Sequence, residues 1–481
     1  MRHSLPLIAA LLLMAATAHA QLWTTFNISN SDISGNTILA TTVDKNNNKY
    51  IGTNLGLCRL TGKVWTDFSM FNEKLKDEFV NCLTVDAKGT LWIGTDNYGI
   101  IEFNGSKWTE HSAETKKHNM KFIRDIAVDK NDVKWIGVTL GGLVRYDNKE
   151  WTKYTQDNSG LLSDFILCVT IDRNNRKWIG TNDGLCVYDD NTWTPYTTRN
   201  SGLPHNIVPA VVIDKQDVRW LGTLGGLARF DGNEWTVFNT ANSPMPSNQI
   251  NDMVLDSHGF LWIATDKGVA LFDRKGHWHI FTPKNAPLPS PVIQNICVDA
   301  QGNKWFGTDF QGLVRFGGQL IEGCVKDSKG KGKAGVTVTL GEYKATTDAE
   351  GHYSLEVPSA AAGTLVPSLE GFEVEPANIQ VSNLVSPRFG CDFTLSAGLM
   401  AHGNSTEKIS VEPFLAEGYI VIHLECPVAE VEFRDQEGNS VRTIPQYKNG
   451  ARITISKMPK RNYTLFIRTA KGEKSLKFNI R

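Results

Sequence analysis

Residues 177–196 read KWIGTNDGLCVYDDNTWTPY, and residues 219–238 read RWLGTLGGLARFDGNEWTVF. The two stretches share a Trp, a Gly-Thr pair, a Gly-Leu pair and a closing Trp-Thr pair, and they begin 42 residues apart. Self-similarity at a fixed period is the sequence signature of a repeat protein. The number of copies and the content of one copy therefore decide the fold.

Seven copies can be aligned, with a period of 42 or 43 residues. Each copy has an Asp, an aromatic residue six positions later that opens a segment such as WIGT, and a Trp that opens a segment such as WTPY. The Asp residues are Asp44, Asp86, Asp129, Asp172, Asp214, Asp256 and Asp299. The aromatic residues are Tyr50, Trp92, Trp135, Trp178, Trp220, Trp262 and Trp305. The Trp residues of the last segment are Trp23, Trp65, Trp108, Trp151, Trp193, Trp235 and Trp278.

Each copy contains four short strand signals, which the fourth copy shows as ILCVTID, KWIGT, GLCVYD and WTPYT, separated by turns such as NDG. Four antiparallel strands in such a period predict one blade of a β-propeller. The chain enters on a fourth-strand segment at 23–26 and leaves on a third-strand segment at 312–316. Pairing of the two completes the last blade and hides an unpaired edge. We therefore predict an all-β chain whose residues 21–318 form a seven-bladed β-propeller closed by the N-terminal strand.

The repeat pattern resembles the two-component regulator propeller repeat family over about residues 23–316, through seven copies of D…WIGT…GL…W. The resemblance implies the propeller fold and a ring that faces a ligand. Sensors of this family carry membrane spans, a kinase and a DNA-binding module, for which this chain has no room. Signalling chemistry is therefore not implied.

Two further β-rich segments follow the repeats. Residues 319–396 include IEGCVKDSKGKGKAGVTVTLGEYKATTDAEGHYSLEVP and look like a carboxypeptidase regulatory-like or transthyretin-like β-sandwich. Residues 397–407 form a polar linker. Residues 408–481 end in MPKRNYTLFIRTAKGEKSLKFNIR and are similar to the C-terminal sorting domains of type IX secretion cargo, although the usual PNP start is replaced by VEPFLAEG. The alternative for this last segment is an ordinary terminal β-sandwich.

The first twenty residues predict export. MRH is a short basic region, LPLIAALLLMAA is an apolar region, and AHA fits a signal-peptide cleavage site, so residues 1–20 form a signal peptide. No later stretch is long and apolar enough for a membrane span. The expected location is the cell surface, the extracellular space or the periplasm. Fifty basic residues against fifty-one acidic ones leave a net charge of −1, which argues against nucleic acid as a partner.

No motif for catalysis or for a cofactor is present. The chain has no G-x-S-x-G, no H-E-x-x-H and no Cys/His cluster with metal spacing. Cys58 and Cys186 occupy equivalent strand positions, as do Cys82 and Cys168, so we interpret these cysteines as small core residues. We predict a protein that is not an enzyme and needs no cofactor or metal. The alternative is a propeller lyase or hydrolase that uses the loop residues His118 and His205.

The repeated Asp and Trp residues are expected to be structural. An Asp that opens a tight turn accepts backbone N–H bonds of that turn, and each Trp supplies packing area within a blade. Three aromatic residues outside these positions, Phe71, Tyr98 and Phe310, fall in predicted loops and offer a stacking surface.

The third copy departs from the others in one loop. Six copies have an Asn seven residues after the opening Trp, whereas the third has Thr115, followed by Lys116, Lys117, His118 and Lys121. One interpretation is a solvated basic loop. The other is a contact for an anion or an acidic glycan, on the face of the ring that the loops between blades share.

The first strands of the copies predict the lining of a central channel. Their early polar residues are Asn81, Arg124, Asp125, Asn251, Asp252, Gln294 and Asn295. The corresponding residues of the other copies are Leu39, Ala40, Leu167, Cys168, Pro209 and Ala210. Such a channel holds ordered water, or it binds a small polar ligand at its mouth.

These patterns favour an exported binding protein that uses the face of a propeller to hold a glycan, a peptide or an envelope protein. The alternative is an envelope scaffold associated with type IX secretion, through residues 408–481. A lyase or hydrolase is a third hypothesis.

Overall fold

The computed structural model describes residues 22–370, 372–397, 409–414, 419–424, 428–447, 452–456, 462–469 and 472–479. The predicted signal peptide at 1–20 and residues 398–407 of the predicted linker lie outside this part of the chain. Contacts divide the chain into two units. The first runs to Leu320 and takes in Glu356–Ala361 and Asn383–Phe389, and the second holds the rest. The predicted domain boundaries stay predictions.

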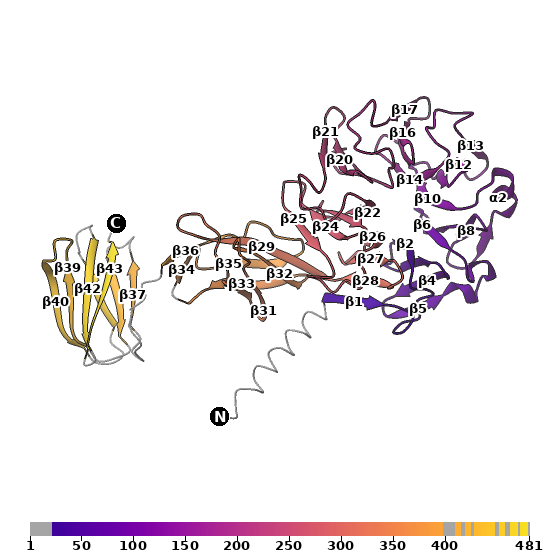
Figure 1. Cartoon of the computed structure of the whole chain (residues 1–481). Helices are drawn as coiled ribbons and strands as arrows, with labels where there is room; N and C mark the ends of the chain where they lie inside the picture. Colours follow the sequence, from indigo (N-terminus) through magenta and orange to yellow (C-terminus); the bar gives the residue numbers. More distant parts are fainter. Residues whose placement is uncertain are drawn as a thin grey trace. The chain divides into compact units, whose positions relative to one another are not determined.

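Within the described residues, the first unit contains seven antiparallel sheets of four strands, all with the same strand order (Figure 1). The first strands are β2 (Ile38–Val43), β6 (Val80–Val85), β10 (Ile123–Val128), β14 (Ile166–Ile171), β18 (Ala210–Ile213), β22 (Ile250–Leu255) and β26 (Ile293–Val298). The second strands are β3 (Lys49–Thr53), β7 (Leu91–Thr95), β11 (Lys134–Val138), β15 (Lys177–Thr181), β19 (Arg219–Thr223), β23 (Leu261–Thr265) and β27 (Lys304–Thr308).

The outer half of each sheet follows the same order. The third strands are β4 (Gly56–Thr61), β8 (Ile100–Phe103), β12 (Gly142–Tyr146), β16 (Gly184–Tyr188), β20 (Gly226–Phe230), β24 (Gly268–Phe272) and β28 (Leu313–Phe316). The fourth strands are β5 (Val64–Asp67), β9 (Trp108–Glu110), β13 (Trp151–Tyr154), β17 (Trp193–Tyr196), β21 (Trp235–Phe238), β25 (Trp278–Phe281) and, from the start of the chain, β1 (Trp23–Phe26). Short helices in the loops are η1 (Phe68–Met70), η2 (Glu73–Leu75) and α2 (Ser112–His118).

The N-terminal strand closes the ring of sheets. β1 pairs with β28, with Trp23 opposite Phe316 and Phe26 opposite Leu313, which confirms the predicted pairing. The first strands contact one another in chain order, and β26 contacts β2. Each of the seven sheets therefore packs between two neighbours, and the last sheet packs against the first.

The repeated Asp has the structural role that the sequence predicts. Asp86 accepts backbone N–H bonds from Lys88 and Thr90 of its own turn, at 3.0 and 2.9 Å. Its other carboxylate oxygen accepts a bond from the indole Nε1 of Trp92 at 3.0 Å, which the sequence did not predict. The same Asp–indole bond recurs at 3.0–3.3 Å in the five later copies. The Asp thus fixes both the turn and the buried Trp.

A cation from the next sheet covers most of these indoles. Lys177, the residue before Trp178, places its Nζ 4.6 Å from the centre of the Trp135 ring, and its side chain is fully buried. Lys49, Lys134, Arg219 and Lys304 make the equivalent contact at 4.7–5.4 Å. A cation over an indole is attracted by the negative face of the ring, most strongly where water is excluded. In five of the seven sheets the first residue of the second strand therefore joins the sheet to the one before it.

The glycine of WIGT permits close packing between sheets. A Cβ at Gly180 would lie 2.2 Å from the backbone oxygen of Val208 in the next sheet and 2.6 Å from the Cys168 sulfur. Neither the backbone of Val208 nor the short side chain of Cys168 can move far enough to make room for a Cβ. The small residue is therefore required because strands of neighbouring sheets meet there.

The cysteines of equivalent strands are core residues, as predicted. Cys58, Cys82, Cys168 and Cys186 are buried and unpaired. Burial raises the pKa of the Cys58 thiol to about 12 and that of the Cys186 thiol to about 11. These thiols are therefore protonated and act as small apolar groups.

The second unit contains most of β29 to β43. Residues 318–397 form two four-stranded sheets, with strand orders β32-β29-β36-β34 and β31-β30-β33-β35. Their strands are β29 (Gly318–Asp327), β30 (Thr337–Leu340), β31 (Tyr343–Thr346), β32 (His352–Pro358), β33 (Ala361–Ser368), β34 (Phe372–Glu375), β35 (Ile379–Leu384) and β36 (Phe393–Ala397). Buried residues of these strands include Val338, Leu355 and Phe393.

The last part of the chain forms a sheet of order β37-β38-β41 and one of order β40-β39-β42-β43. Its strands are β37 (Ile409–Phe414), β38 (Tyr419–Leu424), β39 (Val428–Arg434), β40 (Ser440–Tyr447), β41 (Arg452–Ser456), β42 (Asn462–Thr469) and β43 (Gly472–Asn479). Val431, Phe433 and Leu465 are buried. The described residues of this segment, which the sequence predicts to be β-rich, are strands except for the turn at 435–439.

Deleting residues 22–26 should lower the free energy of unfolding by on the order of 5 kcal/mol. The deletion exposes the edge of β28 and removes Trp23, whose ring lies 4.5 Å from that of Phe316 and 5.4 Å from that of Phe281. Urea unfolding followed by fluorescence measures the change. Trp235→Ala is the control, because it removes a fourth-strand Trp and leaves the ring of sheets closed. A deletion no more costly than this control would contradict the closing role of β1.

Candidate functional site

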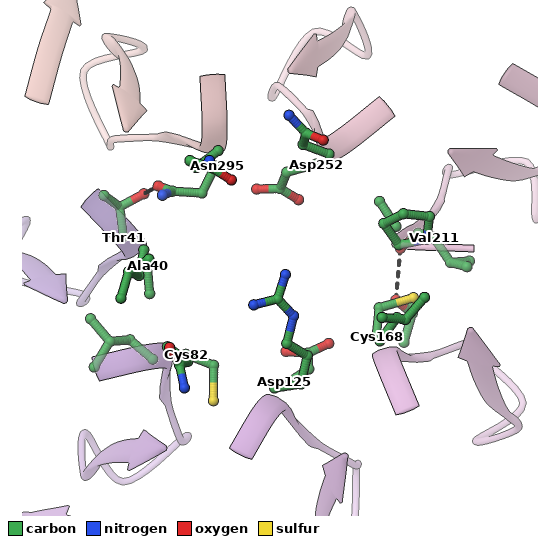
Figure 2. A pocket seen from close by; sticks show the side chains of 18 residues that line it. Ala40, Thr41, Cys82, Asp125, Cys168, Val211, Asp252 and Asn295 are labelled. Carbon is green, nitrogen blue, oxygen red and sulfur yellow. Dashed lines mark hydrogen bonds between the residues drawn. The ribbon is translucent and has the colours of Figure 1, made fainter. Parts of the chain in front are cut away.

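The starts of the first strands surround one cavity on the axis of the ring of sheets (Figure 2). Its volume is about 280 Å³. All the early first-strand residues singled out in the sequence line it, and Arg124, Asp125 and Asp252 are the charged ones. The structure therefore brings these predicted residues together. A ligand-binding role for them stays a prediction.

A shift in strand register turns one residue of most first strands toward the cavity. In β10 the shift lies between Ile123 and Asp125, and in β22 between Ile250 and Asp252. β2, β6, β14 and β26 have it at the corresponding place. The residues at this position in the seven sheets are Ala40, Cys82, Asp125, Cys168, Ala210, Asp252 and Asn295.

Asp125 and Asp252 each tie two sheets together. One carboxylate oxygen of Asp125 accepts the N–H of Ile126 at 2.8 Å, and the other accepts that of Val169 in the next sheet at 2.7 Å. Asp252 repeats the arrangement with Met253 at 2.8 Å and Ile296 at 2.9 Å. Both carboxyl groups point into the same cavity (Figure 2).

The cavity favours the neutral form of both carboxyl groups. Burial raises the pKa of Asp125 to about 6 and that of Asp252 to about 7, and the two backbone N–H bonds of each offset only part of this effect. The charge of Asp125 raises the pKa of Asp252 further, whereas Arg124 lowers that of Asp125. The charge of the cavity therefore changes near neutral pH.

The amide side chains of the cavity are partly occupied by the fold. Asn295 donates to the backbone oxygen of Ile38 and accepts from Thr41, both at 2.9 Å, which joins the last sheet to the first. Asn251 donates to the oxygen of Ile293 at 2.8 Å. Within the described part of the chain, no hydrogen bond or ion pair holds the exposed Arg124. This guanidinium is the only cation among the residues that line the cavity, and it is free to donate hydrogen bonds.

The basic segment of the third copy is a helix, not the loop that the sequence predicts. Residues 112–118 form α2, which ends at Asn119 in a left-handed conformation. Lys116, Lys117 and Lys121 are exposed. His118 lies 3.1 Å from Glu114, and Lys117 lies 3.4 Å from the same carboxylate. Lys116 and Lys121 form no ion pair with a described residue, so the positive charge of the segment is only partly balanced.

The Asn that the third copy lacks is a structural residue of the loops. Asn158 accepts the N–H of Thr155 at 2.7 Å and donates to the oxygen of Lys153 at 3.1 Å. Asn30, Asn200, Asn242 and Asn285 make the same pair of bonds. In the third copy α2 organises the loop instead. The break in the Asn pattern therefore has a structural cause of its own.

The turns between second and third strands and the loops between sheets share one face with the cavity mouth, here called the entry face. The predicted aromatic residues Phe71, Tyr98 and Phe310 lie there and are 66%, 41% and 68% exposed. Leu55 and Leu140, in equivalent turns, are also exposed and were not singled out from the sequence. An exposed apolar surface bordered by polar residues is typical of an interaction site.

The two loop histidines each have a local role. His118 neighbours Glu114, and His205 accepts the backbone N–H of Ile207 at 3.0 Å. Among the described residues, no group of three His, Cys, Asp or Glu side chains is placed to hold a metal ion. Nor does any helix in this part of the chain combine the length and apolar character needed to cross a membrane.

Comparison with known proteins supports the fold. Residues 74–97 and 244–267 match the model of the two component regulator propeller family. No match to a curated protein was found. The chain is similar to the extracellular domain of hybrid two component system BT3049 from B. thetaiotaomicron, with 17% identity and a TM-score of 0.55 over 95% of this chain. It spans 57% of the length of that protein.

Two further solved structures are similar. The extracellular domain of hybrid two component system BT4673 from B. thetaiotaomicron has 15% identity and a TM-score of 0.52, over 96% of this chain and 79% of that one. Virginiamycin B lyase from Staphylococcus aureus has 15% identity and a TM-score of 0.50, over 61% and 98%. At such identities the likeness extends to the fold alone, which is all-β with repeated four-stranded antiparallel sheets.

Asp252→Asn should flatten the pH dependence of stability. The Asp252 pKa is about 7 in the folded protein against 3.8 for the free group, so the folded state holds an extra proton between those values. The stabilisation from this proton is complete below about pH 4 and is lost as the pH rises through 7. Between pH 5 and pH 8 the free energy of unfolding, measured by urea titration, should fall more for the wild type than for the variant.

Asp231→Asn is the control for this measurement. The pKa of Asp231 is lowered to about 2 by backbone N–H bonds of its turn, so this group stays ionised throughout the range. Parallel profiles for the wild type and Asp252→Asn would contradict the raised pKa.

Proposed function

We propose that the chain is an exported binding protein, without catalytic activity, whose seven sheets are the blades of a closed propeller. Its entry face holds a glycan, a peptide or a protein partner. The observation that carries the proposal is the joint presence on this face of the cavity and the exposed residues Phe71, Tyr98 and Phe310.

The entry face has the elements that a binding site needs. The cavity supplies an unpaired cation at Arg124, and α2 adds exposed lysines. Apolar surface with a few placed polar groups is the usual composition of a ligand site. A partner with an acidic or polar group and an apolar surface suits this combination best.

The absence of catalytic activity is part of the proposal. His118 and His205 are engaged with their own loops, which leaves neither arranged as a base beside a nucleophile. The likeness to a lyase concerns the fold and carries no activity.

We further propose that residues 319–396 are a β-sandwich spacer and that residues 408–481 direct the protein through type IX secretion. The resemblance of the final segment to sorting domains supports this. A scaffold in the secretion machinery itself is the second candidate function, which rests on the same resemblance.

Replacing Lys116, Lys117 and Lys121 together by Ala should weaken the binding of an acidic partner, more at low than at high salt. The partner is first identified by screening the wild type against immobilised glycans and envelope extracts. The melting temperature should not change, because the three side chains are exposed.

The control replaces Lys45, Lys130 and Lys215 by Ala. These residues lie in turns between first and second strands, on the opposite face, so the loss of charge is equal. Unchanged binding in the α2 variant at low salt would place the site elsewhere. If the wild type bound neither the immobilised glycans nor any component of the envelope extracts, the proposed binding function would be contradicted.

Deleting residues 408–481 should leave the protein in the periplasm, because the deletion removes the proposed sorting signal. Cell fractionation of the native host measures the effect. Normal delivery of the shortened chain to the surface or medium would make the last segment an ordinary β-rich domain.

A further inference from the structure

The side of the ring of sheets carries a groove between the last sheet and the first, at the place where the ring closes. Its volume is about 1110 Å³. Phe26, Trp305 and Arg315 line it from the last sheet, and Leu60 and Trp65 line it from the first. It shares no lining residue with the central cavity. We call it the side groove.

A repeated aromatic pair normally fills this part of a sheet. In six sheets the third strand ends on an aromatic residue that stacks on the Trp of the fourth strand, with ring centres 3.9–4.5 Å apart. These residues are Phe103, Tyr146, Tyr188, Phe230, Phe272 and Phe316. In the first sheet the residue opposite Trp65 is Leu60.

The same aromatic residue also reaches the sheet before it. The ring centre of Tyr188 lies 5.9 Å from that of Trp135, and the ring centre of Phe316 lies 6.3 Å from that of Trp262. It therefore fills the outer part of the space between two sheets. At the closure of the ring, Leu60 stands in this position, buried beside Trp305, and its smaller side chain lines the side groove.

The lining of the side groove combines aromatic and polar groups. Trp65 is half-buried, Lys63 is exposed and Arg315 is half-buried. Amide side chains of Asn30, Asn47, Gln301 and Asn303 also line it, and each already takes part in a hydrogen bond within the protein. The buried Lys49 is neutralised by Asp299 at 3.2 Å. With Asp32 as the remaining acid, the accessible charge of the groove is positive.

These groups match the chemistry of an acidic pyranose. The carbon face of a sugar ring is apolar and packs on an indole, its hydroxyl groups pair with amides, and its carboxylate pairs with Lys and Arg. We propose that the side groove binds the pyranose ring of an acidic sugar, stacked beside Trp65 with its carboxylate near Lys63 and Arg315. This site is separate from the central cavity and does not depend on the function proposed for the entry face.

Binding of D-galacturonate to the full chain tests the proposal, with D-galactose as the probe that lacks the carboxylate. A ligand of this size should bind with a Kd on the order of 1 mM, and galactose at least threefold more weakly. Titration followed by NMR measures both. Leu60→Phe places the common aromatic side chain in the groove and should weaken galacturonate binding at least tenfold. Its melting temperature should equal or exceed that of the wild type, because this aromatic pair is present in the other sheets.

Lys63→Gln is the second variant, because an exposed residue can be changed without risk to folding. It should weaken galacturonate binding at least threefold and leave galactose binding unchanged. Lys149→Gln is its matched control, since Lys149 also lies two residues before a fourth-strand Trp, in a sheet where Tyr146 fills the corresponding space.

Three results would overturn the proposal. The first is no binding of galacturonate at concentrations tenfold above the expected Kd. The second is equal binding by the wild type, Leu60→Phe and Lys63→Gln. The third is binding that Arg124→Gln abolishes and Leu60→Phe leaves intact, which would place the sugar in the central cavity and support the entry face instead.

Discussion

The contact between the indole of one sheet and the cation of the next is the interaction on which the ring of sheets depends. Each indole is held in place by an Asp of its own sheet, and five of the six indoles have a Lys or Arg of the following sheet above them. The cation is buried, so it is tolerated only where the negative face of the ring and a nearby carboxylate compensate for lost hydration. Lys304 shows the cost, because burial lowers its pKa to about 8. The second and sixth sheets use Leu91 and Leu261 instead, so the ring tolerates apolar contacts at two of its junctions.

The fold could be predicted from the sequence because every copy repeats the same strand order and the same turn residues. The pairing of 23–26 with 313–316 followed from which strand each end of the repeat array supplies. The buried lysines were not foreseen, since Lys is almost always exposed and KWIGT considered alone gives no sign of a neighbouring Trp. Helix α2 was missed for a similar reason. The alignment of the copies places residues 112–118 opposite loops that an Asn fixes, and the third copy lacks this Asn.

The lining of the cavity was predicted because strand starts of a ring must meet at its axis. The sequence could not show which of these polar side chains are free to bind a ligand, because their hydrogen-bond partners lie in other sheets. Asp125 and Asp252 spend both oxygens on backbone N–H groups, one of them in the next sheet, and Asn295 is committed to the junction with the first sheet. The bonds that cross between sheets join residues more than forty positions apart. Leu60 was visible in the aligned copies, yet its meaning required knowing that the aromatic residue at this place touches two sheets at once.

The pairing of β1 with β28 also dictates an order of events during folding. The two strands are about 290 residues apart, so their meeting carries a large entropic cost and waits for the last copy. The intervening sheets are built from neighbouring hairpins and can form earlier. We propose that this chain is exported, and a chain that passes a membrane before it folds gains from such late closure. Its first strand emerges without a partner and cannot lock the molecule into a compact shape before the rest has passed.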